Sequence, residues 1–349
     1  MILPGSYVFS LILLAVSLLL VGSWANTFKW TGGKWRFELY YFDFAVGAVL
    51  LTVIAALTLG SLGFDGFSFG DDLRLAGKRQ DMFAFLAGGF FNLGNMLIVG
   101  GMSLTAMSVA LPIGMTVGLA VGALADLAIN RQASPLLVAG GVVVLILASV
   151  LMAMAWHKFA MARLLDLVRQ GKTKSQRRTV SRKGITLCAV GGVFLGAAQP
   201  FIGFAREGDA GLGPYALAFV FSVGILLSTF VLNLFFMNLP VAGEPIDVIV
   251  YFRAKASEHL PGLLGGMLLM AGLLASLAVA RADSAVAVPP QLTLAITQGA
   301  IVLAMLWGLL AWKEMRGYET GARSWAGVAL LLVIGGIGLV SFALPAAAR

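Results

Sequence analysis

The sequence has little charge, one cysteine and two histidines. Only 11% of its 349 residues are Asp, Glu, Lys or Arg, and 60% are hydrophobic. Soluble proteins carry about 25% charged residues, so a soluble fold could not cover itself with polar surface. Cys188 alone cannot form an intrachain disulfide, and His157 and His259 lie too far apart in sequence for a metal-ligand motif. We therefore expect an integral membrane protein that holds no metal and needs no cofactor.

Catalytic motifs are also missing from the apolar stretches. None of them contains a Ser-His-Asp set or a pair of carboxylates, so we expect no enzymatic activity. Gly171-Lys172-Thr173 resembles the end of a phosphate-binding loop, but the glycine needed five residues earlier is Asp166. This departure argues against nucleotide binding.

Positive charge is concentrated in one stretch, residues 156–184, which holds nine of the 24 Lys and Arg residues. Much of the net charge of +8 thus lies in a loop between apolar regions. Such loops set membrane orientation and face anionic lipid, so we expect membrane lipid as a partner and no nucleic acid. The stretch divides the chain into an N-terminal part (1–155), the basic loop (156–184) and a C-terminal part (185–349).

The apolar stretches are long enough for ten membrane spans. A bilayer core of about 30 Å needs roughly 20 helical residues. One uncharged stretch is too long for a single crossing, and we divide it at Gly100-Gly101. The predicted fold is an all-α integral membrane protein with spans at 5–26, 42–62, 82–100, 104–125, 135–155, 185–205, 214–238, 261–280, 290–312 and 324–345.

The distribution of positive charge predicts the orientation. Ten spans place both termini on one side, and 17 of the 24 Lys and Arg residues fall on the opposite side. Positive loops stay in the cytoplasm. We expect a multi-pass protein of the plasma membrane, in bacteria the inner membrane, with the central basic loop cytoplasmic and both termini outside.

The two halves share sequence features. Each has five spans, and the fourth span of each begins near proline, Pro112 in the first and Pro289-Pro290 in the second. Each fourth span ends near an acid, Asp126 or Glu314. Because five is odd, the second half must cross in the opposite sense. The pattern predicts two inverted five-helix repeats, an arrangement typical of secondary transporters with a substrate site between the repeats.

Asn92 and Asn95 are the first candidates for solute binding. They are three residues apart in a span and thus share one helix face. Two amides there can form hydrogen bonds with a polar solute. The alternative is that they join helices, with well under 2 kcal/mol per bond.

Two further polar stripes lie within spans. Ser222, Thr229 and Asn233 recur at helical spacing, as do Thr293 and Thr297, with Gln298 adjacent. They are candidate solute contacts. The alternative is that the hydroxyls bond to their own helix backbone.

Pro112 and Pro200 lie within or near spans. Each removes a backbone donor and can expose a carbonyl group to a solute or cation during gating. A static kink is the alternative.

Asp43 stands at the edge of the second span, with Glu38 five residues earlier. A carboxylate in a half-desolvated site can exchange a proton during transport, and we take both acids as candidates for proton coupling. The alternatives are an ion pair with Arg36 or Lys29 that acts as a closing latch, or anchoring at the membrane interface.

Short motifs along nearly the whole chain resemble the drug/metabolite transporter superfamily, and most closely its ureide permease branch. Glucose/ribose and rhamnose transporters resemble the sequence more distantly. The motifs are Gly22-Ser23-Trp24, Asp43-Phe44, Gly94-Asn95, GPYALAFVFS over 213–222, Leu232-Asn233 with Pro240-Val241, and WGLLAWKE over 307–314.

The resemblance implies proton-coupled uptake of ureides or nucleobases by two inverted five-helix repeats. It places Trp24, Asn95 and Asn233 near the solute path and makes Glu314 the residue that closes the ninth helix. A proline expected after Trp24 is Ala25, followed by Asn26, which we add to the solute contacts. The third and eighth spans read MLIVGG and AGLLASLA where polar residues are expected, so the site is less polar than in a ureide carrier.

The leading hypothesis is a secondary active transporter that takes up a small polar solute (a ureide, nucleobase or sugar-like molecule) with protons by alternating access. Export of a metabolite or drug is the alternative within the superfamily. A non-transporting membrane scaffold or receptor is the alternative from another class. A homodimer also stays open, because the Gly192 and Gly196 face can pack either internally or between subunits.

Overall fold

The computed structural model describes residues 1–62, 67–171, 182–317 and 321–345. It is 80% helical, with no strand in these ranges. Within these ranges, ten helices are long and apolar enough to cross a membrane. The predicted all-α fold with ten spans is confirmed.

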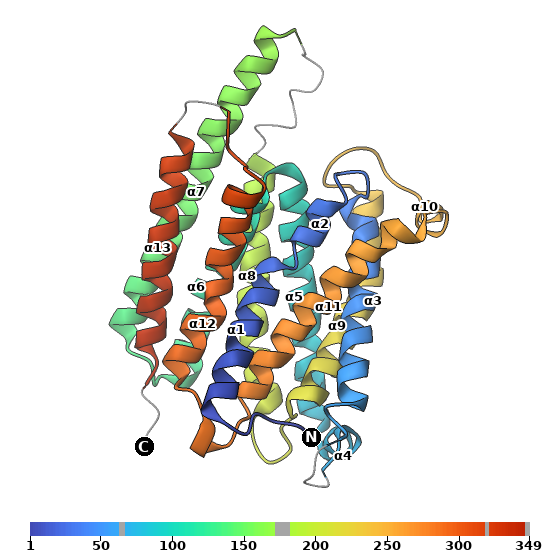
Figure 1. Ribbon diagram of the computed structural model, residues 1–349, viewed down its shortest axis with the longest axis vertical. Coiled ribbons are helices and arrows are strands. Elements are labelled where there is room, and N and C mark those ends of the chain that lie inside the picture. Colours follow the sequence, from blue (N-terminus) through green and yellow to red (C-terminus); the bar gives the residue numbers. More distant parts are fainter. Residues whose placement is uncertain (63–66, 172–181, 318–320, 346–349) are drawn as a thin grey trace. The chain divides into compact units, whose positions relative to one another are not determined.

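Two of the ten spans join neighbouring elements: Tyr7–Trp30 contains α1 and α2, and Pro290–Ala311 contains α12 and η3 (Figure 1). Two short helices, α4 and α10, lie outside them. The helices are α1 (Tyr7–Ser23), α2 (Asn26–Trp30), α3 (Phe37–Leu57), α4 (Phe69–Leu75), α5 (Lys78–Leu104), α6 (Met107–Asn130), α7 (Pro135–Arg169), α8 (Arg182–Arg206), α9 (Pro214–Asn238), α10 (Ile249–Phe252), α11 (Ala256–Val279), the 3-10 turn η2 (Ser284–Val286), α12 (Pro290–Leu306), the π-helical turn η3 (Trp307–Ala311) and α13 (Ala322–Ala343).

Two predicted boundaries are wrong. α5 continues through Gly100-Gly101 to Leu104, because a side chain at Gly101 would meet Cys188 and the Gly184 carbonyl group, so this glycine permits close helix packing and does not break the helix. α7 continues past Trp156, so the first basic residues of the central stretch are helical and do not lie in a loop. Residues 172–181 of that stretch lie outside the described residues.

The chain forms two compact units. Unit 1 holds Met1–Leu93 and Ala197–Ala300, and unit 2 holds Gly94–Gly196 and Ile301–Pro345. The predicted division at residues 156–184 and the inverted relation of the two five-helix halves stay predictions.

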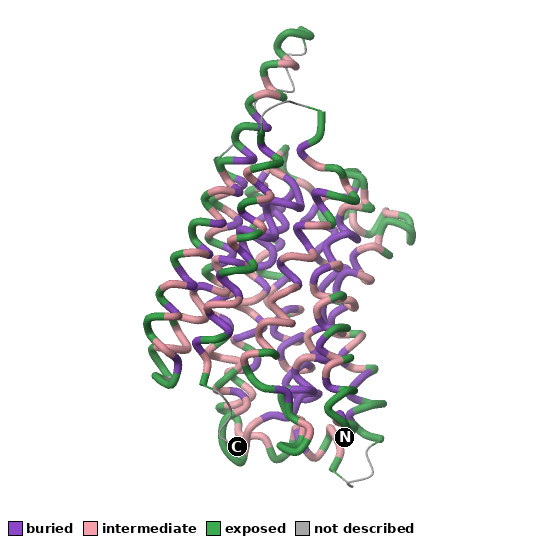
Figure 2. The backbone as a smooth tube through the Cα atoms, turned by 60° about the vertical axis from the view of Figure 1, so that its left-hand side comes forward, coloured by how far each residue is buried: buried purple, intermediate pink, exposed green. Residues whose placement is uncertain are grey.

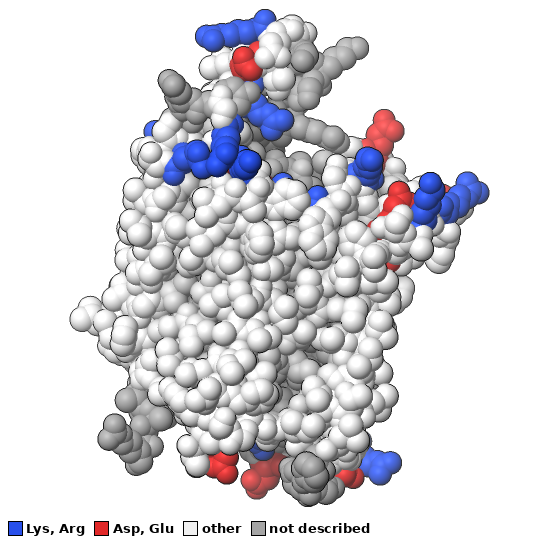
Figure 3. All heavy atoms as spheres, in the orientation of Figure 1, with Lys and Arg blue, Asp and Glu red and all other residues white. Residues whose placement is uncertain are grey.

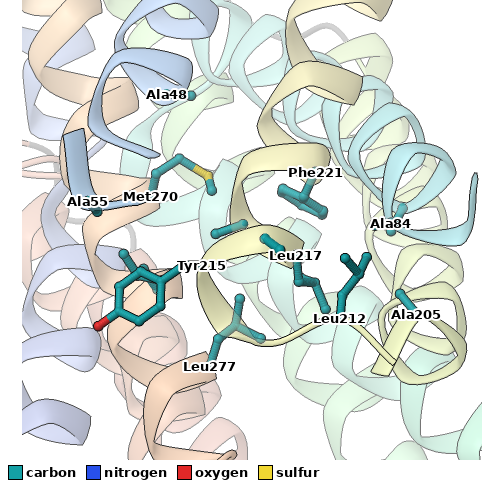
Figure 4. Close-up of a cluster of buried hydrophobic side chains, with 14 of the residues drawn as sticks. Ala48, Ala55, Ala84, Ala205, Leu212, Tyr215, Leu217, Phe221, Met270 and Leu277 are labelled. Carbon is teal, nitrogen blue, oxygen red and sulfur yellow. The ribbon is translucent and has the colours of Figure 1, made fainter. Parts of the chain in front are cut away.

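In unit 1, α3 packs against α9 and α11, and α11 also packs against α1. Side chains of very different size alternate in its core: Ala48 and Ala84 lie near Phe221 and Met270 (Figure 4). Glycine lets the backbones approach, because a side chain at Gly266 would collide with the Phe44 carbonyl group. Small residues serve this purpose in membrane helices, where lipid leaves no hydrophobic driving force between them.

In unit 2, α7 packs along α13 and against α6 (Figure 1). Gly141 and Gly336 lie in the α7–α13 contact. α7 is apolar on its exposed face as well as its buried face, as Val143 and Leu147 show. Buried and exposed stretches alternate along the helices in Figure 2. An exposed apolar face is expected where a helix meets lipid.

Charged side chains lie at helix ends. On the face seen in Figure 3, Lys, Arg, Asp and Glu gather at the two ends of the helices, and the surface between is free of them. Hydrocarbon would exclude these groups, so the pattern matches a multi-pass membrane protein.

Candidate functional site

Asp43 is the centre of a buried polar cluster in unit 1. Its side chain is 3% exposed. Oδ1 accepts a hydrogen bond from the Tyr251 hydroxyl at 2.6 Å and lies 2.9 Å from Nδ1 of His259. When Asp43 is ionised, a protonated Nδ1 donates this bond; when Asp43 is protonated, the carboxyl group can donate to a neutral Nδ1. The pair can therefore hold a shared proton at either atom.

Glycine permits this contact between α3 and α11. A Cβ atom at Gly262 would lie 2.7 Å from the Tyr40 carbonyl oxygen and 3.3 Å from Asp43 Oδ2, and it would collide with Asp43 Cβ. His259 is less than one helical turn before Gly262 on α11. The imidazole is therefore held against the carboxylate by backbone packing.

Aromatic rings enclose the cluster. The His259 ring meets Trp35 edge-on at 5.4 Å and Tyr251 at 4.6 Å between centroids. The Trp35 indole Nε1 is also buried and has no hydrogen-bond partner among the described residues. Asp43 Oδ2 is buried and without a hydrogen-bond partner among the described residues. This oxygen is free to carry a proton or to bind a water molecule.

Tyr251 remains a proton donor. It lies on α10, outside the spans. Burial raises the pKa of Tyr251 far above its ordinary value, and the hydrogen bond to Asp43 raises it further. The phenol therefore stays protonated at neutral pH and ties the segment before α11 to α3.

Glu38 is not part of this cluster. It is 1% exposed and forms an ion pair with Arg36, whose Nη2 lies 2.7 Å from Oε1. Arg36 Nη1 also donates to the Glu244 carbonyl oxygen at 2.5 Å. The arrangement is that of the latch considered above, made by Glu38 and not by Asp43.

Trp24 and Asn26 lie where α1 gives way to α2. Trp24 is 2% exposed and packs against Phe44 at 5.2 Å. Asn26 Nδ2 donates to the Ser23 carbonyl oxygen at 2.8 Å. Thr27 joins this turn to α3 by a 2.7 Å hydrogen bond with Tyr40.

Asn92 joins α5 to α9 within unit 1. Its Nδ2 donates to Ser228 Oγ at 2.8 Å and to Thr229 Oγ1 at 3.0 Å, so this half of the amide joins helices. Asn92 Oδ1 is buried and has no hydrogen-bond partner in the described part of the chain. Ser222 has a similar role, because its hydroxyl bonds to Thr52 on α3 at 2.7 Å.

Asn233 and Asn95 differ from Asn92 and Ser222, whose side chains join helices. Asn233 lies one turn after Thr229 on α9 and is fully buried, yet neither its amide nitrogen nor its oxygen has a hydrogen-bond partner among the residues described. In unit 2, Asn95 is 4% exposed, and its Nδ2 is likewise unpaired within the described ranges. Buried polar groups are normally paired, so both amides are candidates for contact with a solute.

The stripe of Thr293 and Thr297 favours the alternative given above, in which the hydroxyls bond to their own helix backbone. Thr297 Oγ1 donates to the carbonyl oxygens of Thr293 and Leu294 on its own helix. Gln298 is half-buried. No residue on another helix is bonded to Thr297 in the described chain.

The predicted gating residues lie inside or at the ends of helices. Pro112 is within α6, where its carbonyl oxygen accepts from Thr116 Oγ1 at 2.6 Å, and Pro200 is within α8. Glu314 accepts from the backbone N–H groups of Met107 at 3.1 Å and Ser108 at 2.8 Å. It thereby caps α6, whose N-cap residue, Ala106, has no side chain that can do so.

His259 and Tyr251 were missed at the level of sequence. His259 borders the predicted span at 261–280, which is a weak signal, whereas Tyr251 lies in the loop before that span; they are 216 and 208 residues from Asp43. The Gly192 and Gly196 face packs within the chain, against Gly114, Val117, Gly118 and Val121 of α6. A homodimer stays a prediction, without this face to support it.

Comparison with known proteins shows the fold but gives no family, substrate or activity. No family model and no curated protein matches the sequence. A solved structure described only as "Crystal structure of protein" is similar, with a TM-score of 0.51 and 17% identity over 95% of each chain. At this identity the likeness shows a shared fold over nearly the whole length.

Proposed function

We propose that the protein is a secondary active transporter that moves a small polar solute by alternating access and couples this movement to protons through Asp43 and His259. The observation that carries the proposal is the partly buried hydrogen bond between the Asp43 carboxylate and Nδ1 of His259 in a ten-span helical protein. Ionisable groups within membrane spans are expensive and mark proton or ion pathways.

Protonation of this pair would change the contact between α3 and α11. An ionised Asp43 attracts a protonated His259 and accepts from Tyr251, which holds α10 and α11 on α3. A proton on Asp43 removes that charge and weakens both interactions. A helix contact that depends on one proton is the kind of two-state element that alternating access requires.

The unpaired asparagine groups support a solute rich in donors and acceptors. A buried polar group without a partner costs about 1–3 kcal/mol. Asn233 leaves both a donor and an acceptor unpaired, and Asn92 leaves an acceptor unpaired, among the described residues of unit 1. Ureides, nucleobases and sugars carry groups that complement them. This supports the branch to which the sequence motifs are similar.

Transport into proteoliposomes with an imposed pH gradient tests the coupling. Asp43→Asn keeps the hydrogen-bond acceptor for Tyr251 but cannot take up a proton. We expect it to retain exchange of labelled solute across the membrane and to lose accumulation driven by the gradient. Glu38→Gln is the matched control, because Glu38 is held by Arg36, and it should still accumulate solute. Normal accumulation by Asp43→Asn would refute the coupling role.

A thermal-shift screen of the purified protein against allantoin, nucleobases, sugars and amino acids tests the solute class. A ligand at a hundred times its dissociation constant adds about 2.7 kcal/mol of stability. The shift should disappear in Asn233→Ala and persist in Asn238→Ala, an exposed asparagine on the same helix. A shift only with sugars would favour the sugar branch. The absence of a thermal shift with every compound would favour the exporter alternative or the scaffold.

A further inference from the structure

Unit 2 contains a cavity that the transport proposal does not use. Its volume is about 280 Å³, near the lower end of small-molecule sites. It opens between the N-terminus of α6, the later turns of α7 and the segment after η3. It is lined by Ala106, Trp156, Phe159, Arg163, Lys313, Glu314, Met315 and Arg316.

The lining is strongly cationic. Arg163, Lys313 and Arg316 are exposed, and none of them forms an ion pair within the described ranges. The one carboxylate, Glu314, already accepts two backbone N–H groups from α6. Three cations and one anion therefore lie among the described lining residues, which leaves an excess of two positive charges within that set.

One wall of the cavity is aromatic. Trp156 and Phe159 are 6% and 7% exposed, and their ring centroids are 5.7 Å apart. This wall holds water away from one side of the cationic groups, which strengthens their attraction for an anion. It also provides apolar surface for a group attached to that anion.

The backbone places the cations around Glu314. Lys313 and Met315 have φ angles of 53° and 61°, in the left-handed region that side chains disfavour. The Met315 side chain is 2% exposed and anchors the turn. Lys313 precedes Glu314 in this turn and Arg316 follows it, so the turn holds two cations close in sequence to the carboxylate that caps α6.

We propose that this cavity binds a phosphate monoester that carries a small apolar or aromatic group. A dianionic phosphate neutralises the excess charge of two, and guanidinium groups bind phosphate oxygens in pairs. The attached group would lie on Trp156 and Phe159. A lipid headgroup and a soluble phosphate ester both offer this chemistry.

Calorimetric titration of the purified full chain in a neutral detergent tests the proposal. The probes are phenyl phosphate and dioctanoyl phosphatidic acid, and phenol and dioctanoylglycerol are the matched compounds without phosphate. We expect saturable binding of at least one phosphate probe and none of its partner compound. Arg163→Gln, and separately Arg316→Gln, should weaken binding about tenfold or more. Arg169→Gln, which removes an exposed cation of the same helix outside the cavity, should leave it unchanged.

The pattern of binding separates the two sources. Binding of phenyl phosphate alone identifies a soluble ester, and binding of phosphatidic acid alone identifies a lipid headgroup. Should either arginine variant lose its fold, Lys313→Gln provides the same comparison. The proposal is overturned if neither probe binds saturably, or if Arg169→Gln weakens binding as much as Arg163→Gln does.

Discussion

Two carboxylates inside the helical units have opposite surroundings. In unit 1, Asp43 shares one oxygen with a histidine and a tyrosine and keeps a second, buried oxygen without a partner in the described chain. In unit 2, both oxygens of Glu314 accept backbone N–H groups at the start of α6. The two backbone N–H partners of Glu314 carry no titratable proton, whereas Asp43 lies beside an imidazole and a phenol. In the mechanism that we propose, Asp43 exchanges a proton, whereas Glu314 caps the start of α6.

Both carboxylates are packed against a glycine. A Cβ atom would lie 3.3 Å from Asp43 Oδ2 at Gly262 and 2.6 Å from Glu314 Oε2 at Gly308. Close packing against a glycine therefore occurs both at the carboxylate proposed to couple protons and at the carboxylate that caps a helix. What distinguishes them is the chemistry of the bonding partners.

The largest effect is expected from Gly262→Leu and Gly308→Leu. Each side chain would collide with backbone atoms, so each should lower the free energy of unfolding by about 3 kcal/mol. Unfolding in a denaturing detergent measures this. Gly335→Leu is the control, because nothing lies within 4 Å of a Cβ there. Wild-type stability of Gly262→Leu would contradict the close packing of α3 on α11.

Glu314→Ala should cost about 2 kcal/mol of unfolding free energy, because α6 loses its cap and the negative charge at its N-terminus. Glu314→Gln should cost about half as much, since one amide oxygen still accepts. Thermal unfolding measures the loss. The pH profile of transport should not move in Glu314→Gln. A loss of proton-driven accumulation would mean that Glu314 also couples.

His259→Gln should lower the unfolding free energy by only about 1 kcal/mol but change the dependence of transport rate on pH, because the proton proposed to be shared with Asp43 loses one of its two sites. His157→Gln is the matched control, because His157 is exposed on α7. An unchanged pH profile in His259→Gln would remove His259 from the coupling pair.

Tyr251→Phe should cost about 1 kcal/mol of unfolding free energy at neutral pH, as little as His259→Gln, and its distinctive effect should appear only at high pH. Because the folded-state pKa of Tyr251 is raised, the unfolded chain loses this proton first, and the free energy of unfolding falls as pH rises above about 10. Tyr251→Phe should make that fall shallower. Tyr7→Phe, at an exposed position, should not. Unfolding at pH 9 to 11 makes the comparison.

The spans could be predicted from sequence because the bilayer imposes a local rule. About 20 apolar residues must follow one another whatever the rest of the chain does. The rule fails at the edges of spans. α5 passes through Gly100-Gly101 and α7 passes Trp156, because a glycine in a packed helix and a basic helix outside hydrocarbon both look like loops in sequence.

The candidate site could be predicted only in part. Asp43 stands out in sequence, because a carboxylate beside an apolar run is unusual. Its partners do not stand out, since His259 and Tyr251 follow it by more than 200 residues. Asn92 and Asn233 are both asparagines in similar apolar runs. The Asn92 amide nitrogen has three hydrogen-bond contacts, whereas neither amide atom of Asn233 has a partner in the described chain.

The sequence by itself determined that ten stretches are long and apolar enough to cross a membrane as helices, because span length and apolar composition are properties of a continuous stretch. The tertiary structure alone decided which polar group meets which. Pairing depends on where glycine lets two backbones approach, as at Gly262, and on which side chains then lie within hydrogen-bond distance. Those contacts join residues far apart in the chain, and no spacing rule connects them.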